Sequence, residues 1–296
     1  MGKNSVYWFL VLIPVVSSCG FRLRIPRKAW FSLFNSPYPA HLHESALDVY
    51  YPENEVLMPI EEGKVLEVRW FETPKIRKDC LGFEPLILIR LNKKKVVKVL
   101  HVNPSVKVGE KVRLGDPLGK PIISGYFLPW TNPHAHFELR KVTDPYRALG
   151  AYKLKLDKRF KVGLKNPCKK GCLVFRVLEK GVDGVWVQPL NADFRLSGLT
   201  VFSGRKQCFL DGGIPFHGYG VAVGGRNSPI KTFDGKVLGK VIGKTNAGVV
   251  FKPTRKIYVN GKRIVGVESF LNQNLVKLVG VKEKLSTGDH VELKFR

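Results

Sequence analysis

The chain has 296 residues, of which 44% are hydrophobic, and it contains 29 Gly and 19 Pro. This length and composition exclude a coiled coil, a single small module and a disordered chain, and they predict two globular domains rich in β-structure. Lys and Arg number 50 against 24 Asp and Glu, which gives a formal net charge of +26. Such a charge predicts attraction to an anionic polymer or surface. Because the sequence has no recognisable nucleic-acid-binding motif, we expect no specific binding of nucleic acid.

The first 21 residues have two interpretations. The apolar run Val6–Val16 is too short for a transmembrane helix but suits the core of a signal peptide, and Ser17-Ser18-Cys19 resembles a lipoprotein cleavage box. On this interpretation the protein is exported and lipid-anchored at Cys19. The alternative is an N-terminal strand in a cytoplasmic protein, which the β-branched and aromatic residues of the run favour.

Five cysteines are too few for a disulfide scaffold of this size. Cys168 and Cys172 could close a small disulfide loop or supply half of a metal knuckle. No second Cys/His pair with zinc-finger spacing follows them, so we interpret them as ordinary thiols.

Short apolar runs broken by Gly, Pro and Asn predict antiparallel strands over the first domain, residues 22–151. The strongest strand candidates are Gly63–Trp70, Pro85–Leu91 and Val96–Val102. The segment Val106–Gly119, with glycines among buried-type Val and Leu, is expected to carry the chain from one sheet of a barrel-like sandwich to another.

The second domain, residues 152–296, is also predicted to be all-β, and we interpret it as a targeting or substrate-positioning module. His217 lies in a Gly-rich stretch and is interpreted as part of a loop. The strand candidates of this domain are Leu173–Leu178, Val185–Val187, Leu199–Phe202, Lys236–Ile242, Ile257–Val259 and His290–Phe295.

The stretch from Asn132 to Arg140 carries the clearest chemical signal. Because side chains alternate along a strand, His134, His136 and Glu138 should share one face. Ala135, Phe137 and Leu139 should then enter the core on the other face. Imidazole is both a common zinc donor and a base that works near neutral pH, so this face suits a metal ligand beside a proton-transfer group. A plain surface pair of histidines is the alternative.

Upstream segments add further candidate ligands, and in order they resemble the M23 family of zinc metallopeptidases, the lysostaphin-like and LytM-like endopeptidases. The resemblance covers about residues 41–140, whereas the second half resembles no known family. The segments that carry it are His43 with Asp48, Met58-Pro59, Gly63-Lys64-Val65, His101, the turn at Val106–Gly119, His134-Ala135-His136 and Phe137-Glu138.

The resemblance implies a barrel-sandwich fold, the duplicated hybrid motif, and a zinc endopeptidase acting on peptides such as cell-wall cross-links. Zn²⁺ would be bound by His43, Asp48 and His136, with a fourth position open for water. His101 and His134 would flank that water as catalytic groups. We expect Glu138 to orient an imidazole through a hydrogen bond with its other ring nitrogen. Glu44 is expected to be solvated.

One spacing departs from that family, because Asp48 follows His43 by five positions instead of four. A difference of five positions places the two side chains on opposite faces of a regular strand. We expect a bulge at Ser45-Ala46 that keeps His43 as the ligand; the alternatives are that His41 replaces it or that the site is degenerate. A degenerate site would leave a catalytically inactive M23-like scaffold or a basic surface-binding protein.

Overall fold

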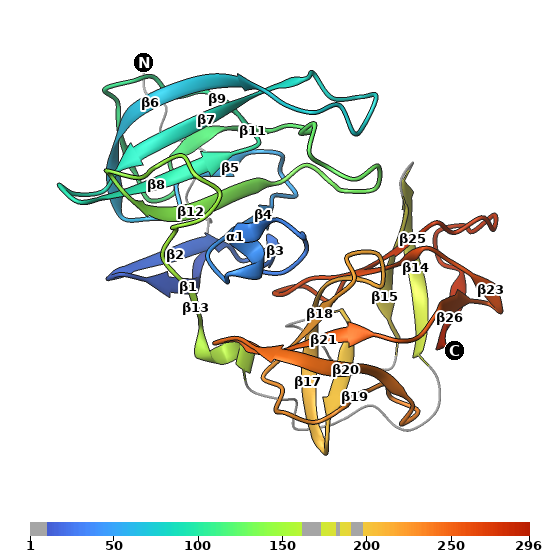
Figure 1. The fold of residues 1–296 in the computed structure, drawn as a ribbon. Helices are drawn as coiled ribbons and strands as arrows, with labels where there is room; N and C mark the ends of the chain where they lie inside the picture. Colours follow the sequence, from blue (N-terminus) through green and yellow to red (C-terminus); the bar gives the residue numbers. More distant parts are fainter. Residues whose placement is uncertain (1–10, 162–172, 182–183, 191–197) are drawn as a thin grey trace.

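The computed structural model describes residues 11–161, 173–181, 184–190 and 198–296, and it shows an all-β protein of two β domains in contact with each other (Figure 1). The α-helical part of these residues is one turn, α1 (Pro39–Leu42), and a 3-10 turn covers Lys158–Lys161. None of the described helices is long and apolar enough to cross a membrane. The all-β class predicted from the sequence is confirmed.

The first domain is built on a seven-stranded antiparallel sheet that curls into a half barrel (Figure 1). Its strands, in spatial order, are β10 (Lys111–Arg113), β6 (Glu62–Glu72), β7 (Phe83–Arg90), β8 (Lys95–Leu100), β12 (Ala135–Lys141), β4 (Leu47–Tyr50) and β3 (Trp30–Ser32). Two three-stranded sheets complete the domain: β5 (Val56–Leu57), β11 (Pro117–Pro121) and β9 (Val102–Pro104), and β13 (Lys155–Leu156), β1 (Leu12–Ser18) and β2 (Phe21–Pro26).

The Gly-rich segment after β9 crosses between sheets, as its sequence predicted. β9 and β11 belong to a three-stranded sheet, whereas β10 between them joins the seven-stranded sheet. Gly119 has a φ of +144°, and a Cβ there would lie 1.9 Å from the Asn103 carbonyl oxygen. Glycine is therefore required where β11 passes β9. The predicted strands Gly63–Trp70, Pro85–Leu91 and Val96–Val102 correspond to β6, β7 and β8.

The N-terminal apolar run enters the fold as β1, which pairs with β2 and β13. Val15 and Val16 are buried in the core of the first domain, while residues 6–10 of the run lie outside the described residues. Because β13 pairs with β1, the first domain extends beyond residue 151, the boundary expected from the sequence. Cys19, Cys80 and Cys208 are free thiols, and Cys168 and Cys172 lie outside the described part of the chain.

The second domain contains a six-stranded closed β-barrel, which β17 completes by pairing with β16. In order around the barrel the strands are β16 (Thr200–Ser203), β19 (Ile230–Lys231), β20 (Val237–Lys244), β21 (Gly248–Pro253), β18 (Gly220–Val223) and β17 (Lys206–Ile214). The sheet continues from β17 through β24 (Gly266–Ser269), β25 (Val276–Val279), β15 (Gly184–Pro189), β14 (Leu173–Gly181), β26 (His290–Phe295), β22 (Ile257–Val259) and β23 (Lys262–Arg263).

All six strands predicted for the second half are present, but the sequence did not reveal β17, β18, β19, β21, β23, β24 and β25. The reason is clearest for β17. This strand contains Gly212 and Gly213, residues that normally weaken a strand. Gly212 has a φ of +109°, and a Cβ there would lie 2.8 Å from the Phe34 carbonyl oxygen. Glycine occurs at this position because the two domains approach each other closely there, and no local sequence pattern reveals such a contact.

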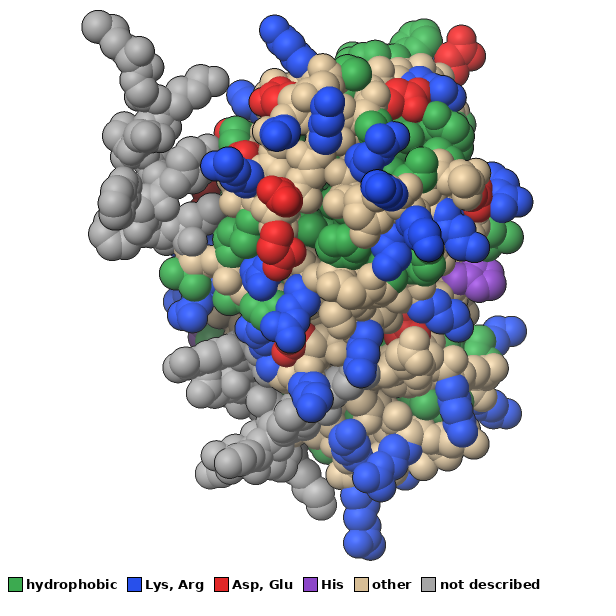
Figure 2. Space-filling view, turned by 90° about the vertical axis from the view of Figure 1, so that its left-hand side faces the viewer, with side chains coloured by type: hydrophobic (Ala, Val, Ile, Leu, Met, Phe, Trp, Pro, Cys, Tyr) green, Lys and Arg blue, Asp and Glu red, His purple; other side chains and the backbone are tan. Residues whose placement is uncertain are grey.

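Lys and Arg side chains are spread over the face seen in Figure 2, with fewer acidic groups among them. On the barrel, Lys240 of β20 lies directly opposite Lys252 of β21, and both are exposed. Like charges in that position repel each other, and neither lysine has an ion-pair partner within the described residues. The expected affinity for an anionic surface stays a prediction.

The hydrophobic core of the first domain extends into the second, where it includes Phe209, Val221 and Leu271, and buried hydrogen bonds also cross the interface. Phe31 and Leu271 exchange backbone hydrogen bonds of 3.1 and 2.8 Å across the interface. The Asp211 carboxylate of β17 accepts hydrogen bonds from Ser32 Oγ at 2.5 Å and from the Leu33 amide at 2.9 Å. The domains are therefore joined by polar groups that are removed from water and paired with each other.

Asp211 makes the stability of the protein depend on pH. Complete burial raises the pKa of its carboxyl to about 7, against the hydrogen bonds from Ser32 and Leu33. Since this value lies above the unfolded value of about 3.9, the folded chain binds more protons between about pH 4 and 7, and the stability that Asp211 contributes falls as pH rises through that window.

We therefore expect Asp211→Asn, which cannot ionise, to gain about 2 kcal/mol in free energy of unfolding relative to the wild type between pH 5 and pH 8. Denaturant unfolding of both metal-free proteins at the two pH values measures this difference. A difference that stays constant across the range would contradict the assignment.

Candidate metal centre

The alternation predicted for β12 is present in the structure. His136 and Glu138 are buried on one side, together with His134 immediately before the strand. Ala135, Phe137 and Leu139 belong to the hydrophobic core on the other side. The core side chains fix the pleat, and this pleat holds the imidazoles toward the concave side of the half barrel.

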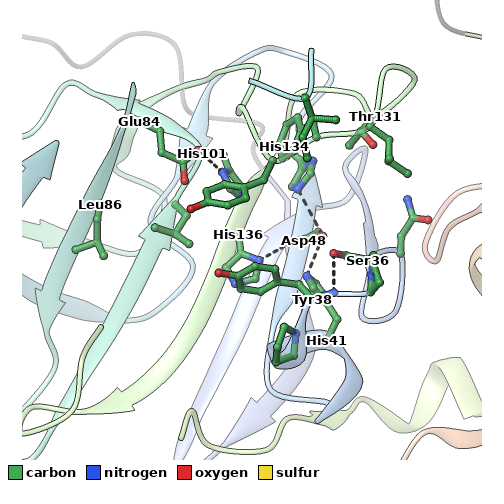
Figure 3. Close-up of a pocket in the computed structure, with 18 of the residues that line it drawn as sticks. Ser36, Tyr38, His41, Asp48, Glu84, Leu86, His101, Thr131, His134 and His136 are labelled. Atoms are coloured by element: carbon green, nitrogen blue, oxygen red, sulfur yellow. Dashed lines mark hydrogen bonds and ion pairs between the residues drawn. The ribbon is translucent and has the colours of Figure 1, made fainter. Parts of the chain in front are cut away.

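Three buried side chains bring metal-ligating atoms together at this point: His41, Asp48 and His136, whose donor atoms all lie within 4.8 Å of one another (Figure 3). Asp48 of β4 lies directly opposite His136 of β12 in the sheet register. Asp48 Oδ1 is 2.9 Å from His136 Nδ1, and Asp48 Oδ2 is 3.1 Å from His41 Nε2. His41 comes from α1, so one short helix and two neighbouring strands form the cluster.

In His41 and His136, the ring nitrogen that faces away from Asp48 contacts another polar group of the protein. His41 Nδ1 lies 2.8 Å from the Leu33 carbonyl oxygen, and His136 Nε2 lies 3.0 Å from Glu138 Oε1. Glu138 is itself held by Arg140 at 2.5 Å and by Lys98 at 3.1 Å. Outer partners of this kind fix the tautomer and the orientation of a metal-binding histidine, and Glu138 occupies the orienting position expected of it.

The structure corrects the position predicted for His43, which was expected to lie beside Asp48. The chain before β4 leaves strand geometry, as the spacing required, but it forms the helical turn α1 instead of a bulge at Ser45-Ala46. Residues two apart on a helix point in nearly opposite directions. His41 is therefore buried beside Asp48, while His43 follows the turn and is exposed to solvent. His41, the alternative candidate, therefore lies in the position expected of His43.

Two further imidazoles flank the cluster. His134 Nε2 lies 3.5 Å from Asp48 Oδ2, and its Nδ1 lies 2.8 Å from the Asn132 carbonyl oxygen. His101 Nδ1 lies 2.9 Å from Glu84 Oε2, and the His101 and His134 ring centroids are 5.4 Å apart. His101 has a φ of +64°. That conformation is uncommon outside glycine and is often found at functional sites.

The histidines line a cavity of about 600 Å³ (Figure 3). One part of its wall is apolar, with Phe71, Ile76, Leu86 and Leu100, and the half-exposed Tyr38 and Tyr126 rings meet beside it at a centroid distance of 6.1 Å.

His217 from the second domain also lines the cavity, although the sequence indicated only a loop residue. Its buried Nε2 has no hydrogen-bond partner in the part of the chain that the structure describes. No local pattern predicts this position, because a separate domain brings His217 to the cavity.

Electrostatics favour an ionised Asp48, the form that can bind a metal, and a neutral His134 beside it. Burial alone would raise the pKa of Asp48, but the His41 and His134 rings and the hydrogen bond with His136 outweigh it and hold the pKa well below its usual value. Burial lowers the pKa of His134 to about 4, so its imidazole is neutral at pH 7.

His136 behaves differently. Burial alone would lower the pKa of its imidazole, but the hydrogen bonds with Asp48 and Glu138 outweigh it and raise the pKa to about 9 in the metal-free chain. A metal ion must therefore displace a proton from His136, which makes metal binding weaker as pH falls.

Family models cover most of the chain. The model described as the DUF8155 N-terminal domain matches residues 23–156, and the DUF8155 C-terminal domain, from the same domain of unknown function, matches residues 173–296. The chain belongs to the DUF8155 family. A comparison with curated proteins found no match.

This assignment overturns the resemblance to the M23 zinc metallopeptidases. The region that suggested it, about residues 41–140, lies inside the N-terminal DUF8155 domain. The resemblance rested on shared residue types. The one spacing that departed from the M23 pattern, from His43 to Asp48, lies where the structure brings a different histidine, His41, beside Asp48.

Proposed function

We propose that this DUF8155 protein is a zinc-dependent hydrolase that cleaves a peptide bond, with His41, Asp48 and His136 as protein ligands. The observation that carries the proposal is the buried convergence of these three donors within 4.8 Å, beside two further imidazoles in one cavity. Two histidines and one carboxylate, with a fourth position left for water, are a typical donor set of catalytic zinc.

The donor chemistry fits zinc at this position. Asp48 is ionised, and the rear nitrogens of His41 and His136 are occupied by Leu33 and Glu138, so each ligand offers one defined atom. Zinc held by His41, Asp48 and His136 would supply Lewis-acid chemistry: it would lower the pKa of water toward about 7 and polarise a carbonyl group.

The flanking histidines would supply proton transfer and charge stabilisation. His134 is neutral at pH 7 and can donate its Nδ1 hydrogen to Asn132, which leaves the Nε2 lone pair to accept a proton from water as a general base. His101, oriented by Glu84, keeps Nε2 for the cavity. In its protonated form it can donate a hydrogen bond to the oxygen that becomes negative in a tetrahedral intermediate.

The cavity wall indicates the kind of substrate. A volume of about 600 Å³ accommodates a short stretch of peptide. The apolar patch of Phe71, Leu86 and Leu100 lies on the same concave surface as the histidines and favours an apolar side chain near the cleaved bond.

Metal analysis followed by a cleavage assay tests the proposal. The full chain is stripped with a chelator, reloaded with zinc, analysed for bound metal, and incubated with a mixture of peptides whose fragments are identified by mass spectrometry. We expect about one zinc per chain and cleavage that is lost on chelation, restored by zinc and absent in Asp48→Ala.

Failure to bind zinc after reloading would overturn the proposal. Zinc bound without cleavage of any peptide in the mixture would reject the hydrolase and leave a metal-stabilised scaffold.

A further inference from the structure

We propose that the C-terminal domain holds His41 in position, so that the metal centre depends on both domains. This inference rests on the proposed metal-binding function. Its basis is the segment from Ser32 to Glu44, which carries His41 and is bonded to the second domain at its start, in its middle and at its end.

At the start of the segment, Asp211 of β17 holds the peptide that orients His41. Its carboxylate accepts hydrogen bonds from Ser32 Oγ and from the Leu33 amide, at 2.5 and 2.9 Å. The Leu33 carbonyl oxygen then lies 2.8 Å from His41 Nδ1. Two consecutive hydrogen bonds therefore connect the barrel to the imidazole.

The middle of the segment is held by Tyr219, which lies in the second domain and is buried. Its hydroxyl lies 3.1 Å from the Phe34 carbonyl oxygen and 2.5 Å from that of Ser36. Next to it, Asn35 Nδ2 donates to Glu268 Oε1 of β24 at 3.2 Å. The segment just before α1 is thus bonded to the second domain through the Phe34 and Ser36 carbonyl groups and the Asn35 side chain.

The end of the segment is held by Glu44, which the sequence analysis expected to be solvated. The structure corrects that expectation: Glu44 is only 3% exposed, and its carboxylate accepts hydrogen bonds from the backbone amides of Asn246 and Ala247, both at 2.7 Å. These amides belong to the turn between β20 and β21. Hydrogen bonds to a buried carboxylate are among the stronger polar contacts in proteins.

His41 needs this support more than the other two ligands do. Asp48 and His136 lie on paired strands of the half barrel, so the sheet fixes them. His41 lies on a helix of four residues without a side-chain cap, and so short a helix is not stable by itself. A metal ligand must be held within about 0.5 Å of its productive position. The contacts from the second domain supply that restraint.

The test compares zinc affinity in full-length variants. Glu44→Gln keeps the side-chain shape but offers one acceptor to two amides, and Tyr219→Phe removes only the hydroxyl. Zinc dissociation constants are measured by competition with a chromophoric chelator, the cobalt-substituted proteins are compared by absorption spectroscopy, and melting temperatures are recorded without metal. We expect zinc binding to weaken about tenfold or more in each variant, the scale seen when outer partners of a ligand are removed, with an altered cobalt spectrum.

Asn272→Gly is the matched control. Asn272 Nδ2 also bonds across the domain interface, to the Arg27 and Ala29 carbonyl oxygens at 3.0 and 2.6 Å, but it contacts the chain before the His41 segment. Its φ of +74° suits glycine. We expect this variant to lower the melting temperature while zinc affinity and the cobalt spectrum stay unchanged.

Three outcomes would overturn the inference. Unchanged zinc affinity in Glu44→Gln and Tyr219→Phe, when the wild type binds zinc, would reject it and leave the proposed function standing. Equal weakening in Asn272→Gly would show a general effect of interface stability. A wild-type chain that binds no zinc would reject the proposed function itself, and this inference with it.

Discussion

His41→Ala is expected to lose its zinc, whereas His43→Ala, two residues along the chain, is expected to bind zinc like the wild type. The reason is geometric: His41 Nε2 lies 3.1 Å from Asp48 Oδ2 in the buried cluster, while His43 is exposed after the helical turn. Removing one of the three donors that form the cluster within the described residues should weaken zinc binding by more than the 10- to 100-fold that the loss of an outer partner costs.

Zinc content after equilibrium dialysis, together with a dissociation constant from chelator competition, measures this effect. Asp48→Ala and His136→Ala should behave like His41→Ala, because each removes a donor of the same cluster. Retention of zinc by His41→Ala together with its loss from His43→Ala would reverse the ligand assignment made here.

His134→Ala and His101→Ala are expected to keep zinc and yet lose about 10²- to 10⁴-fold in turnover, the usual scale for a lost general acid–base group. His134 contributes a neutral Nε2 beside Asp48, and His101 is oriented toward the same cavity by Glu84. Neither belongs to the group of three donors.

Zinc content and the rate of peptide cleavage are measured on the same preparations, with the exposed His290→Ala as a control that should change neither. Because His134 Nε2 lies 3.5 Å from Asp48 Oδ2, release of zinc from His134→Ala would make His134 a fourth ligand. Unchanged cleavage in both variants would reject the proposed mechanism even with zinc bound.

The local pattern of the sequence was sufficient to predict one half of the site. Period-two alternation placed His136 and Glu138 of β12, and His134 immediately before it, on one face, because the apolar residues between them must enter the core. The same reasoning located β6, β7 and β8 and the Gly-rich crossing between sheets. Such features depend on neighbours within a few residues, which the sequence displays directly.

The wider resemblance to a peptidase family was wrong because it compared residue types and spacings without the tertiary contacts that position them. The segment between His41 and Asp48 contains two histidines at plausible spacings, and the sequence favours His43. The choice is made by α1, a turn whose end is fixed by Glu44 bonding to the backbone of Asn246 and Ala247, about 200 residues away in the chain.

The sequence by itself determined the all-β class, two domains and the histidine face of β12, because apolar periodicity and turn residues act locally. Only the tertiary structure decided that His41 joins Asp48, that His217 of the second domain lines the cavity, and that β17 closes the barrel against β16. Each of these depends on contacts between distant segments. Long-range packing selects among locally acceptable arrangements, and the free energy that makes the selection comes from surfaces that meet only in the folded protein.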